Sequence, residues 1–190
     1  MKTDFAREQI WWEGKTGREE QDLADEAVNR ALRWREIDRC LKGVKTIAEV
    51  GAAAGAFSIP LAKRGYEVTH IDFSAAAIAL AQKKAEGLKN IKFIKANAVD
   101  LHMFRDEEFD LVLNMDGAVS FCGLEAPRSI KESCRICGKT LIITTANKGG
   151  VVPIWVNETL PKFKKIVPAL KTMLKDGFWH YDQHAHNKRT

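Results

Sequence analysis

The alternation of short apolar runs with segments of helical spacing is the feature that most constrains the fold of this chain. The alternation begins after Gly43, where the spacing of the apolar residues changes. We expect strands at residues 45–50, 66–71, 91–96, 109–115 and 140–146. Because helical segments separate them, such strands form βαβ units, and right-handed crossovers arrange them as a mostly parallel sheet.

The segments around these strands carry helix signals. Residues 16–43 open with a capping box, Thr16 and Glu19, and then place an apolar residue at every third or fourth position. Further helices are expected at residues 56–64, from a Ser74 cap to Leu88, and near residues 125–136. The sequence therefore predicts an α/β fold, a doubly wound, mostly parallel, Rossmann-like sheet with helices on both faces.

Length and charge divide the chain into three parts of one domain. A chain of 190 residues suits a single domain, with a helical cap at residues 1–43, a core at 44–147 and a basic helical segment at 148–190. The last segment has eight Lys or Arg against three Asp or Glu and accounts for the net charge of +5. We interpret it as a solvated helix face, since no aromatic or arginine pattern accompanies the lysines, and contact with nucleic acid is the alternative.

Composition excludes several classes of protein. No run approaches the roughly 18 apolar residues of a membrane span, and the charged N-terminus has no apolar signal core. Four cysteines are too few for a disulfide scaffold, so we expect a cytoplasmic protein. We interpret Cys134 and Cys137 as buried thiols and expect no metal site; a site formed by His180, His184 and His186 with Asp182 is the alternative.

The turn at residues 49–55, EVGAAAG, joins the first strand to a helix through small residues. Such a turn presents free backbone N–H groups at the end of the sheet where open α/β folds bind ligands. The dinucleotide fingerprint G-x-G-x-x-G would need glycine at positions 51, 53 and 56, and only Gly51 fits. The pattern E/D-x-G-x-G-x-G fits better, because Glu49, Gly51 and Gly55 match and Ala53 departs. A nicotinamide-dependent oxidoreductase is therefore disfavoured.

Three further strands end in polar or small residues at the same edge of the sheet. Asp72, 21 residues after Gly51, is placed to accept hydrogen bonds from the two hydroxyls of a ribose. Asn97 and Ala98 follow the third strand, where an adenine ring would lie. Residues 114–117, Asn-Met-Asp-Gly, follow the fourth and would face a second substrate.

With these motifs, residues 40–147 resemble the class I S-adenosylmethionine-dependent methyltransferases, in the group with small or unassigned substrates. The resemblance rests on the turn above and on HIDFS at 70–74, KANAVDL at 95–101, FDLVLNMDGAVSF at 109–121 and ESCRICGKTLII at 132–143. It implies S-adenosylmethionine as cofactor and in-line transfer of its methyl group to a small-molecule acceptor. The alternatives are a non-catalytic cofactor-binding or regulatory module and an RNA or protein methyltransferase.

The resemblance also implies roles for individual residues of the core, residues 44–147. The implied cofactor-binding residues are Glu49, Gly51, Ala52, Ala53, Gly55, Asp72, Phe73, Asn97, Ala98 and Asn114. Those at 49–55 would surround the methionine part of the cofactor, Asp72 would bind the ribose, and Asn114 would lie near the transferred methyl. Ala53 replaces a glycine of the family pattern, and its methyl would crowd the cofactor if the backbone takes a positive φ there.

The substrate side is less defined. Asp116 is the candidate catalytic residue, with a simple Asp116-Gly117 turn as the alternative. The pattern (D/N)-P-P-(Y/F) of nucleic-acid amine methyltransferases is missing at residues 114–117, which argues against a nucleobase acceptor. Trp11 and Trp12 would form either an aromatic lid over a cationic methyl donor or a packing surface.

The sheet of this family ends in two further strands, which we do not find after Ala146. We therefore expect this strand pair to be absent or truncated. The sheet edge left exposed would favour a homodimer.

Overall fold

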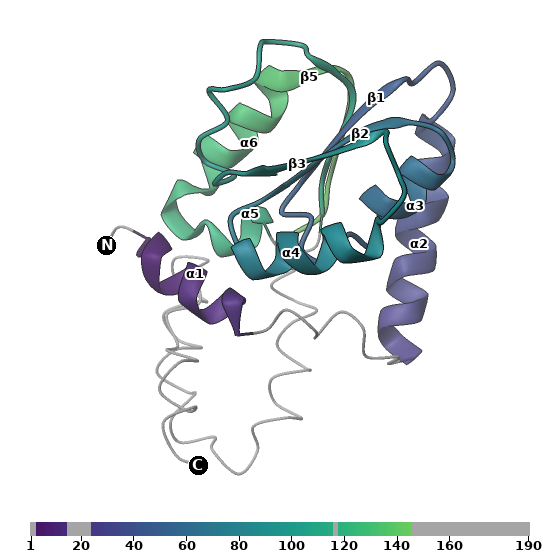
Figure 1. Ribbon diagram of the computed structural model, residues 1–190. Helices are drawn as coiled ribbons and strands as arrows, with labels where there is room; N and C mark the ends of the chain where they lie inside the picture. Colours follow the sequence, from purple (N-terminus) through teal and green to yellow (C-terminus); the bar gives the residue numbers. More distant parts are fainter. Residues whose placement is uncertain (1–2, 15–23, 116–117, 146–190) are drawn as a thin grey trace. The chain divides into compact units, whose positions relative to one another are not determined.

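The computed structural model describes residues 3–14, 24–115 and 118–145 (Figure 1). The chain divides into two compact units, Met1–Thr145 and Ala146–Thr190, and only the first contains described residues. The predictions for the basic segment, the terminal histidines and the missing strand pair therefore lie outside the described residues. The same holds for the Thr16–Glu19 capping box and for Asp116.

The described part of the chain folds around a five-stranded parallel sheet in the order β3-β2-β1-β4-β5. Its strands are β1 (Thr46–Val50), β2 (Glu67–Asp72), β3 (Ile91–Lys95), β4 (Phe109–Asn114) and β5 (Cys137–Ile143). Strands β1, β2 and β3 follow one another toward one edge of the sheet, and β4 and β5 follow one another toward the other edge. The direction in which successive strands are added therefore reverses between β1 and β4. In open α/β sheets the crevice at such a reversal is the usual ligand site.

Helices cover both faces of this sheet (Figure 1). They are α1 (Phe5–Glu13), α2 (Ala24–Cys40), α3 (Ser58–Lys63), α4 (Ala75–Lys84), α5 (Ala118–Phe121) and α6 (Ala126–Ile136), with a short 3₁₀ helix η2 (Gly123–Glu125) before α6. Together with the parallel sheet, they confirm the predicted doubly wound α/β fold. Ser74 caps α4 as predicted, since its side chain accepts a hydrogen bond from the Ala77 N–H.

Neighbouring residues of the central strand β1 point to opposite faces and enter separate cores. Ile47 packs in the cluster that contains Leu61 of α3, and Ala48 packs in the cluster that contains Ile136 of α6. All four side chains are buried. A strand buried on both faces has a continuous apolar run, which is why the sequence predicted these strands well.

Three local predictions are corrected by the structure. Strand β5 begins at Cys137 rather than at residue 140, and α4 ends at Lys84 rather than at Leu88. Cys134 is exposed and Cys137 is half-buried, so the prediction of two buried thiols is wrong. The reason is that Ser129, Ser133 and Ile136, not the thiol of Cys134, form the buried face of α6.

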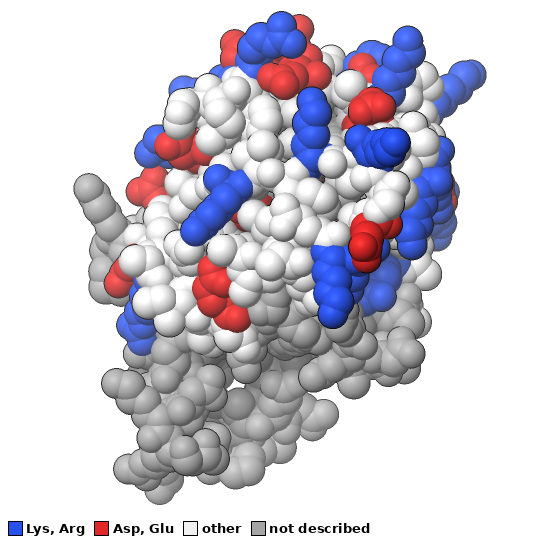
Figure 2. Space-filling model, viewed as in Figure 1, with Lys and Arg blue, Asp and Glu red and all other residues white. Residues whose placement is uncertain are grey.

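Figure 2 shows basic side chains gathered over the side of the molecule formed by α2 and α3, with acidic side chains among them. Several of the basic residues are paired: Arg39 with Glu36 at 2.9 Å and Arg64 with Asp38 at 2.6 Å. Exposed pairs of this kind contribute little to stability, but they neutralise part of the basic surface. No helix among the described residues is long and apolar enough to cross a membrane.

Candidate active site

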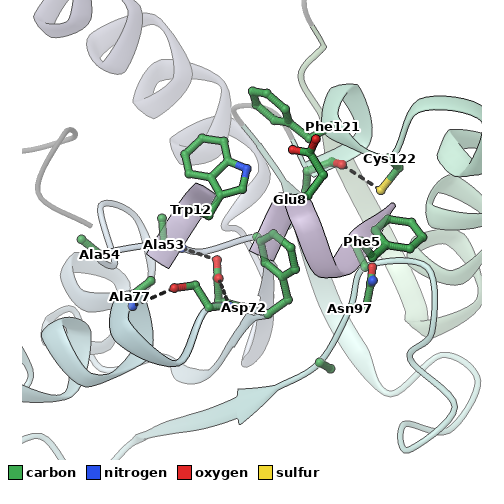
Figure 3. Close-up of a pocket in the computed structure, with 16 residues that line it drawn as sticks. Phe5, Glu8, Trp12, Ala53, Ala54, Asp72, Ala77, Asn97, Phe121 and Cys122 are labelled. Atoms are coloured by element: carbon green, nitrogen blue, oxygen red, sulfur yellow. Dashed lines mark hydrogen bonds between the residues drawn. The ribbon is translucent and has the colours of Figure 1, made fainter. Parts of the chain in front are cut away.

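A pocket opens at the carboxyl ends of β1, β2 and β3, beneath α1 (Figure 3). It encloses about 860 Å³, including its open mouth. The sequence predicted a site at this edge because parallel strands bring their carboxyl ends together.

The floor of the pocket is the turn between β1 and α3, whose backbone is left-handed at three alternate residues. The φ angles are +74° at Gly51, +44° at Ala53 and +84° at Gly55. The N–H groups of Gly51 and Ala52 donate to the carbonyl of Ile71 at 2.9 and 3.0 Å, which ties the turn to the end of β2. Ala53 thus occupies the backbone conformation in which a Cβ is unfavourable, which is the condition under which its methyl was expected to crowd the cofactor.

Asp72 joins this turn to the start of α4. One carboxylate oxygen accepts a hydrogen bond from the Ala53 N–H and the other from the Ser74 N–H, each at 2.8 Å (Figure 3). Burial raises the pKa of Asp72, and hydrogen bonds from these N–H groups oppose the rise. The carboxylate therefore has a fixed orientation at the end of β2, facing the pocket.

A buried polar cluster supports the turn from below. The Glu49 carboxylate accepts a hydrogen bond from the Ser58 N–H at 2.6 Å, and Ser58 Oγ lies 2.9 Å from His70 Nδ1. Burial lowers the pKa of His70 to about 4, so its ring is neutral at pH 7. Ser58 and His70 could not be singled out from spacing along the chain, because the cluster forms only when β1, β2 and α3 come together.

The predicted cofactor residues fall into two groups. Six of them line the pocket: Gly51, Ala53, Asp72, Phe73, Asn97 and Ala98. Four do not, namely Glu49, Ala52, Gly55 and Asn114. Glu49 lies in the cluster below the turn, and Ala52 is buried. Gly55 packs against α3, where a Cβ would come within 2.6 Å of the Ile59 side chain.

Asn114 does not line the pocket and faces α6 instead. Its side chain is fully buried and donates from Nδ2 to Ser133 Oγ at 2.9 Å and to Ser129 Oγ at 3.4 Å, both on α6. The amide therefore holds α6 against β4, and its place near the transferred methyl stays a prediction.

The roof of the pocket comes from α1, which lies in the region predicted as a helical cap, although helical spacing was recognised there only from residue 16. The carboxylate of Glu13 accepts hydrogen bonds from the Ala75 and Ala76 N–H groups at 2.8 Å each, at the start of α4. At the other end, Thr3 Oγ1 donates to the Cys122 carbonyl at 2.7 Å. Helix α1 is thus held at both ends across the mouth of the pocket.

Phe5, Glu8 and Trp12 of α1 line the pocket, together with Phe121 and Cys122 from α5 and the turn after it. The Trp12 ring meets Phe121 edge-on at 4.9 Å, and Trp11 meets Trp12 edge-on at 4.7 Å. Trp12 thus lies where a lid was predicted, whereas Trp11 packs behind it. The Asp4 cap of α1, which accepts a hydrogen bond from the Arg7 N–H, is the sequence signal that could have located this helix.

Replacing Ala53 by glycine should stabilise the domain. A left-handed residue with a Cβ costs roughly 1–2 kcal/mol, and the extra freedom of glycine in the unfolded chain offsets roughly 0.5–1 kcal/mol of the gain. We expect Ala53→Gly to raise the unfolding free energy by up to about 1 kcal/mol in urea titrations. The matched variant Ala54→Gly, at a residue without positive φ, should lower the unfolding free energy instead. If both variants changed the unfolding free energy in the same direction, the left-handed conformation of Ala53 would be contradicted.

Comparison with known proteins places this site in a family. Residues 47–139 match the model of the methyltransferase domain family. A structure of an S-adenosylmethionine-dependent methyltransferase from Methanosarcina mazei is 28% identical, with a TM-score of 0.56 over 67% of this chain and 65% of that one. Fold and motifs together define a class I S-adenosylmethionine-dependent methyltransferase domain. Residues 47–139 belong to this family, whose methyl donor is S-adenosylmethionine.

Curated relatives match over shorter stretches. A Geobacillus sp. (strain WCH70) protein designated a methyltransferase is 39% identical over 72 residues, which are 37% of this chain. The chloroplastic magnesium protoporphyrin IX methyltransferase of Arabidopsis thaliana is 33% identical over 112 residues, 58% of this chain. The chain spans 28% and 35% of the length of these two proteins.

Proposed function

We propose that this domain transfers the methyl group of S-adenosylmethionine to a small-molecule acceptor. The observation that carries the proposal is the Asp72 carboxylate, which two backbone N–H groups hold at the end of β2 with its face toward the pocket. A fixed carboxylate at this strand end is suited to accept hydrogen bonds from the two hydroxyls of a ribose.

The other lining residues suit the rest of the same molecule. Asn97 and Ala98, after β3, would contact the adenine, and Phe73 would flank its ring. The turn that includes Gly51 and Ala53 would lie against the methionine part, where its small side chains leave room. When bound, the cofactor supplies a methyl group activated by a sulfonium charge, and the chain needs only to hold donor and acceptor in line.

The charge of the pocket fits a cationic donor. Among the described lining residues the charged side chains are Asp72 and Glu8, and none is Lys, Arg or His. Aromatic faces of Trp12 and Phe121 complete an environment that favours a sulfonium over an anion.

The proposal is tested by turnover. The full chain is incubated with methyl-labelled S-adenosylmethionine and a panel of small amines, phenols and carboxylates, and release of S-adenosylhomocysteine is followed. We expect release that depends on one class of acceptor and is lost in Asp72→Asn. Tight cofactor binding without turnover on any acceptor would instead indicate a binding module. Methylation of RNA with affinity that falls steeply with salt would indicate a nucleic-acid enzyme.

A further inference from the structure

His70 is a buried polar side chain that the proposed function leaves without a role. It is fully buried on β2, below the turn between β1 and α3, and its Nδ1 lies 2.9 Å from Ser58 Oγ. Among the residues that the structure describes, none forms a hydrogen bond with the other ring nitrogen, Nε2. Buried polar atoms of native proteins nearly always have a partner, so an unpaired Nε2 needs a physical explanation.

The backbone of Ala53 is the part of the turn that interacts with the His70 ring. This interaction opposes the fall in the pKa of His70 that burial causes. A hydrogen-bond acceptor favours the protonated form of histidine, so the backbone group involved is the Ala53 carbonyl. His70 and Asp72 are two residues apart on β2 and therefore point to the same face of the sheet. Because the Asp72 carboxylate accepts a hydrogen bond from the Ala53 N–H at 2.8 Å, these two side chains approach both polar groups of the Ala53 backbone.

The conformation of Ala53 explains why such a restraint matters. Its φ is +44°, and a residue with a Cβ adopts this left-handed region at a cost that is absent for glycine. Ala53 also lines the pocket, where the turn would lie against the methionine part of the cofactor. Relaxation of Ala53 to a negative φ would change the shape of the pocket floor. Side chains that oppose this relaxation therefore preorganise the floor for its ligand.

We propose that His70 is a positioning residue for the cofactor and that it acts through Ala53. The Ser58 hydroxyl donates to Nδ1, the proton of the neutral ring is on Nε2, and this N–H is directed to the carbonyl of Ala53. Together with Asp72, His70 holds Ala53 in the left-handed conformation in which the turn meets S-adenosylmethionine. The inference rests on the proposed function and adds to it a residue that does not itself line the pocket.

Two variants of His70 separate hydrogen bonding from packing. The ring also packs against Phe93, with the ring centroids 5.0 Å apart. His70→Phe keeps an aromatic ring without an N–H, whereas His70→Gln loses the ring and keeps an amide N–H. In titration calorimetry on the full chain, we expect His70→Phe to weaken the binding of S-adenosylhomocysteine about five-fold or more, and His70→Gln to stay within about two-fold of the unsubstituted chain. The reverse order of affinities would mean that His70 acts by packing, and unchanged affinity in both variants would mean that it has no positioning role.

The same comparison in the Ala53→Gly background tests whether His70 acts through Ala53. Glycine adopts a positive φ without the cost of a Cβ, so the loss of affinity caused by His70→Phe should shrink to less than about two-fold. An equal loss in both backgrounds would overturn the proposal. His102→Phe, the same change at an exposed histidine, should leave the affinity for S-adenosylhomocysteine unchanged.

A measurement on the unsubstituted chain does not depend on how well the variants fold. In protein with isotope-labelled histidine, the ring nitrogen resonances show which nitrogen carries the proton, and the His70 signals are those missing in His70→Gln. We expect the proton on Nε2 at neutral pH, and a shift of this resonance when S-adenosylhomocysteine binds. A proton on Nδ1 would overturn the proposal.

Failure of this inference and failure of the proposed function have different signatures. If S-adenosylhomocysteine binds but the variants or the ring proton contradict the expectations for His70, only the positioning role is wrong. If S-adenosylhomocysteine does not bind the folded protein, both proposals fall together.

Discussion

Asp72→Asn is expected to weaken the binding of S-adenosylhomocysteine about ten-fold or more, as measured by titration calorimetry. Hydrogen bonds from hydroxyls to a charged carboxylate contribute roughly 1.5–3 kcal/mol, and each 1.4 kcal/mol corresponds to about a factor of ten in affinity. The substitution keeps the size of the side chain, but it replaces one acceptor oxygen by a donor amide and removes the charge.

Asp72 also has a structural role that the experiment must separate from binding. Its carboxylate accepts hydrogen bonds from Ala53 and Ser74, so the variant disturbs both the turn after β1 and the start of α4. A ligand without the two ribose hydroxyls resolves the ambiguity, because a direct contact predicts that Asp72→Asn has little effect on its binding. Equal losses of affinity for the two ligands would mean that Asp72 shapes the turn and does not contact the ribose hydroxyls.

A control variant shows whether charge removal elsewhere affects binding. Asp106 is exposed and pairs with Arg135 at 2.9 Å, outside the pocket. Asp106→Asn should therefore leave the affinity for S-adenosylhomocysteine unchanged. Urea unfolding of both variants would show whether each is folded at the temperature of the titration.

Features that depend on local pattern were predictable from this sequence. Strands β1 and β4 have apolar runs because both of their faces are buried, and Asp72 could be placed at the pocket because every parallel strand ends at the same edge. The pattern of the turn has glycine at position 53, so the sequence could raise a left-handed backbone at Ala53 only as a condition. Each of these inferences needs only residues that are close in sequence.

The features that were missed depend on distant partners. Helix α1 is held by Glu13 through N–H groups 62 and 63 residues away, and by Thr3 through a carbonyl 119 residues away. Asn114 turns toward α6 because Ser129 and Ser133 are there to accept its hydrogen bonds. Spacing along the chain contains no signal for such contacts, so the roof of the pocket emerged only with the fold.

Gly51→Ala is expected to destabilise the domain by about 1–4 kcal/mol and to weaken cofactor binding. The loss of glycine's freedom in the unfolded chain offsets roughly 0.5–1 kcal/mol of the backbone and packing costs. The left-handed backbone at φ +74° costs a residue with a Cβ roughly 1–2 kcal/mol. In addition, the new methyl would lie 2.6 Å from Cβ of Ala118, which begins α5, so the turn and α5 would have to separate. Overpacking of this kind costs roughly 1–3 kcal/mol.

Gly43 provides a closely matched control for this variant. Its φ is +75°, close to that of Gly51, but no atom lies within 4 Å of the position that a Cβ would take. Gly43→Ala should therefore show only the net backbone cost, up to about 1 kcal/mol after the same offset from the unfolded chain, and leave the affinity for S-adenosylhomocysteine unchanged. The difference between the unfolding free energies of the two variants, measured in urea, gives the cost of the contact between the turn and Ala118. Because both Gly51 and Ala118 line the pocket, a difference near zero would mean that α5 can shift, and that close packing at this point does not set the shape of the pocket.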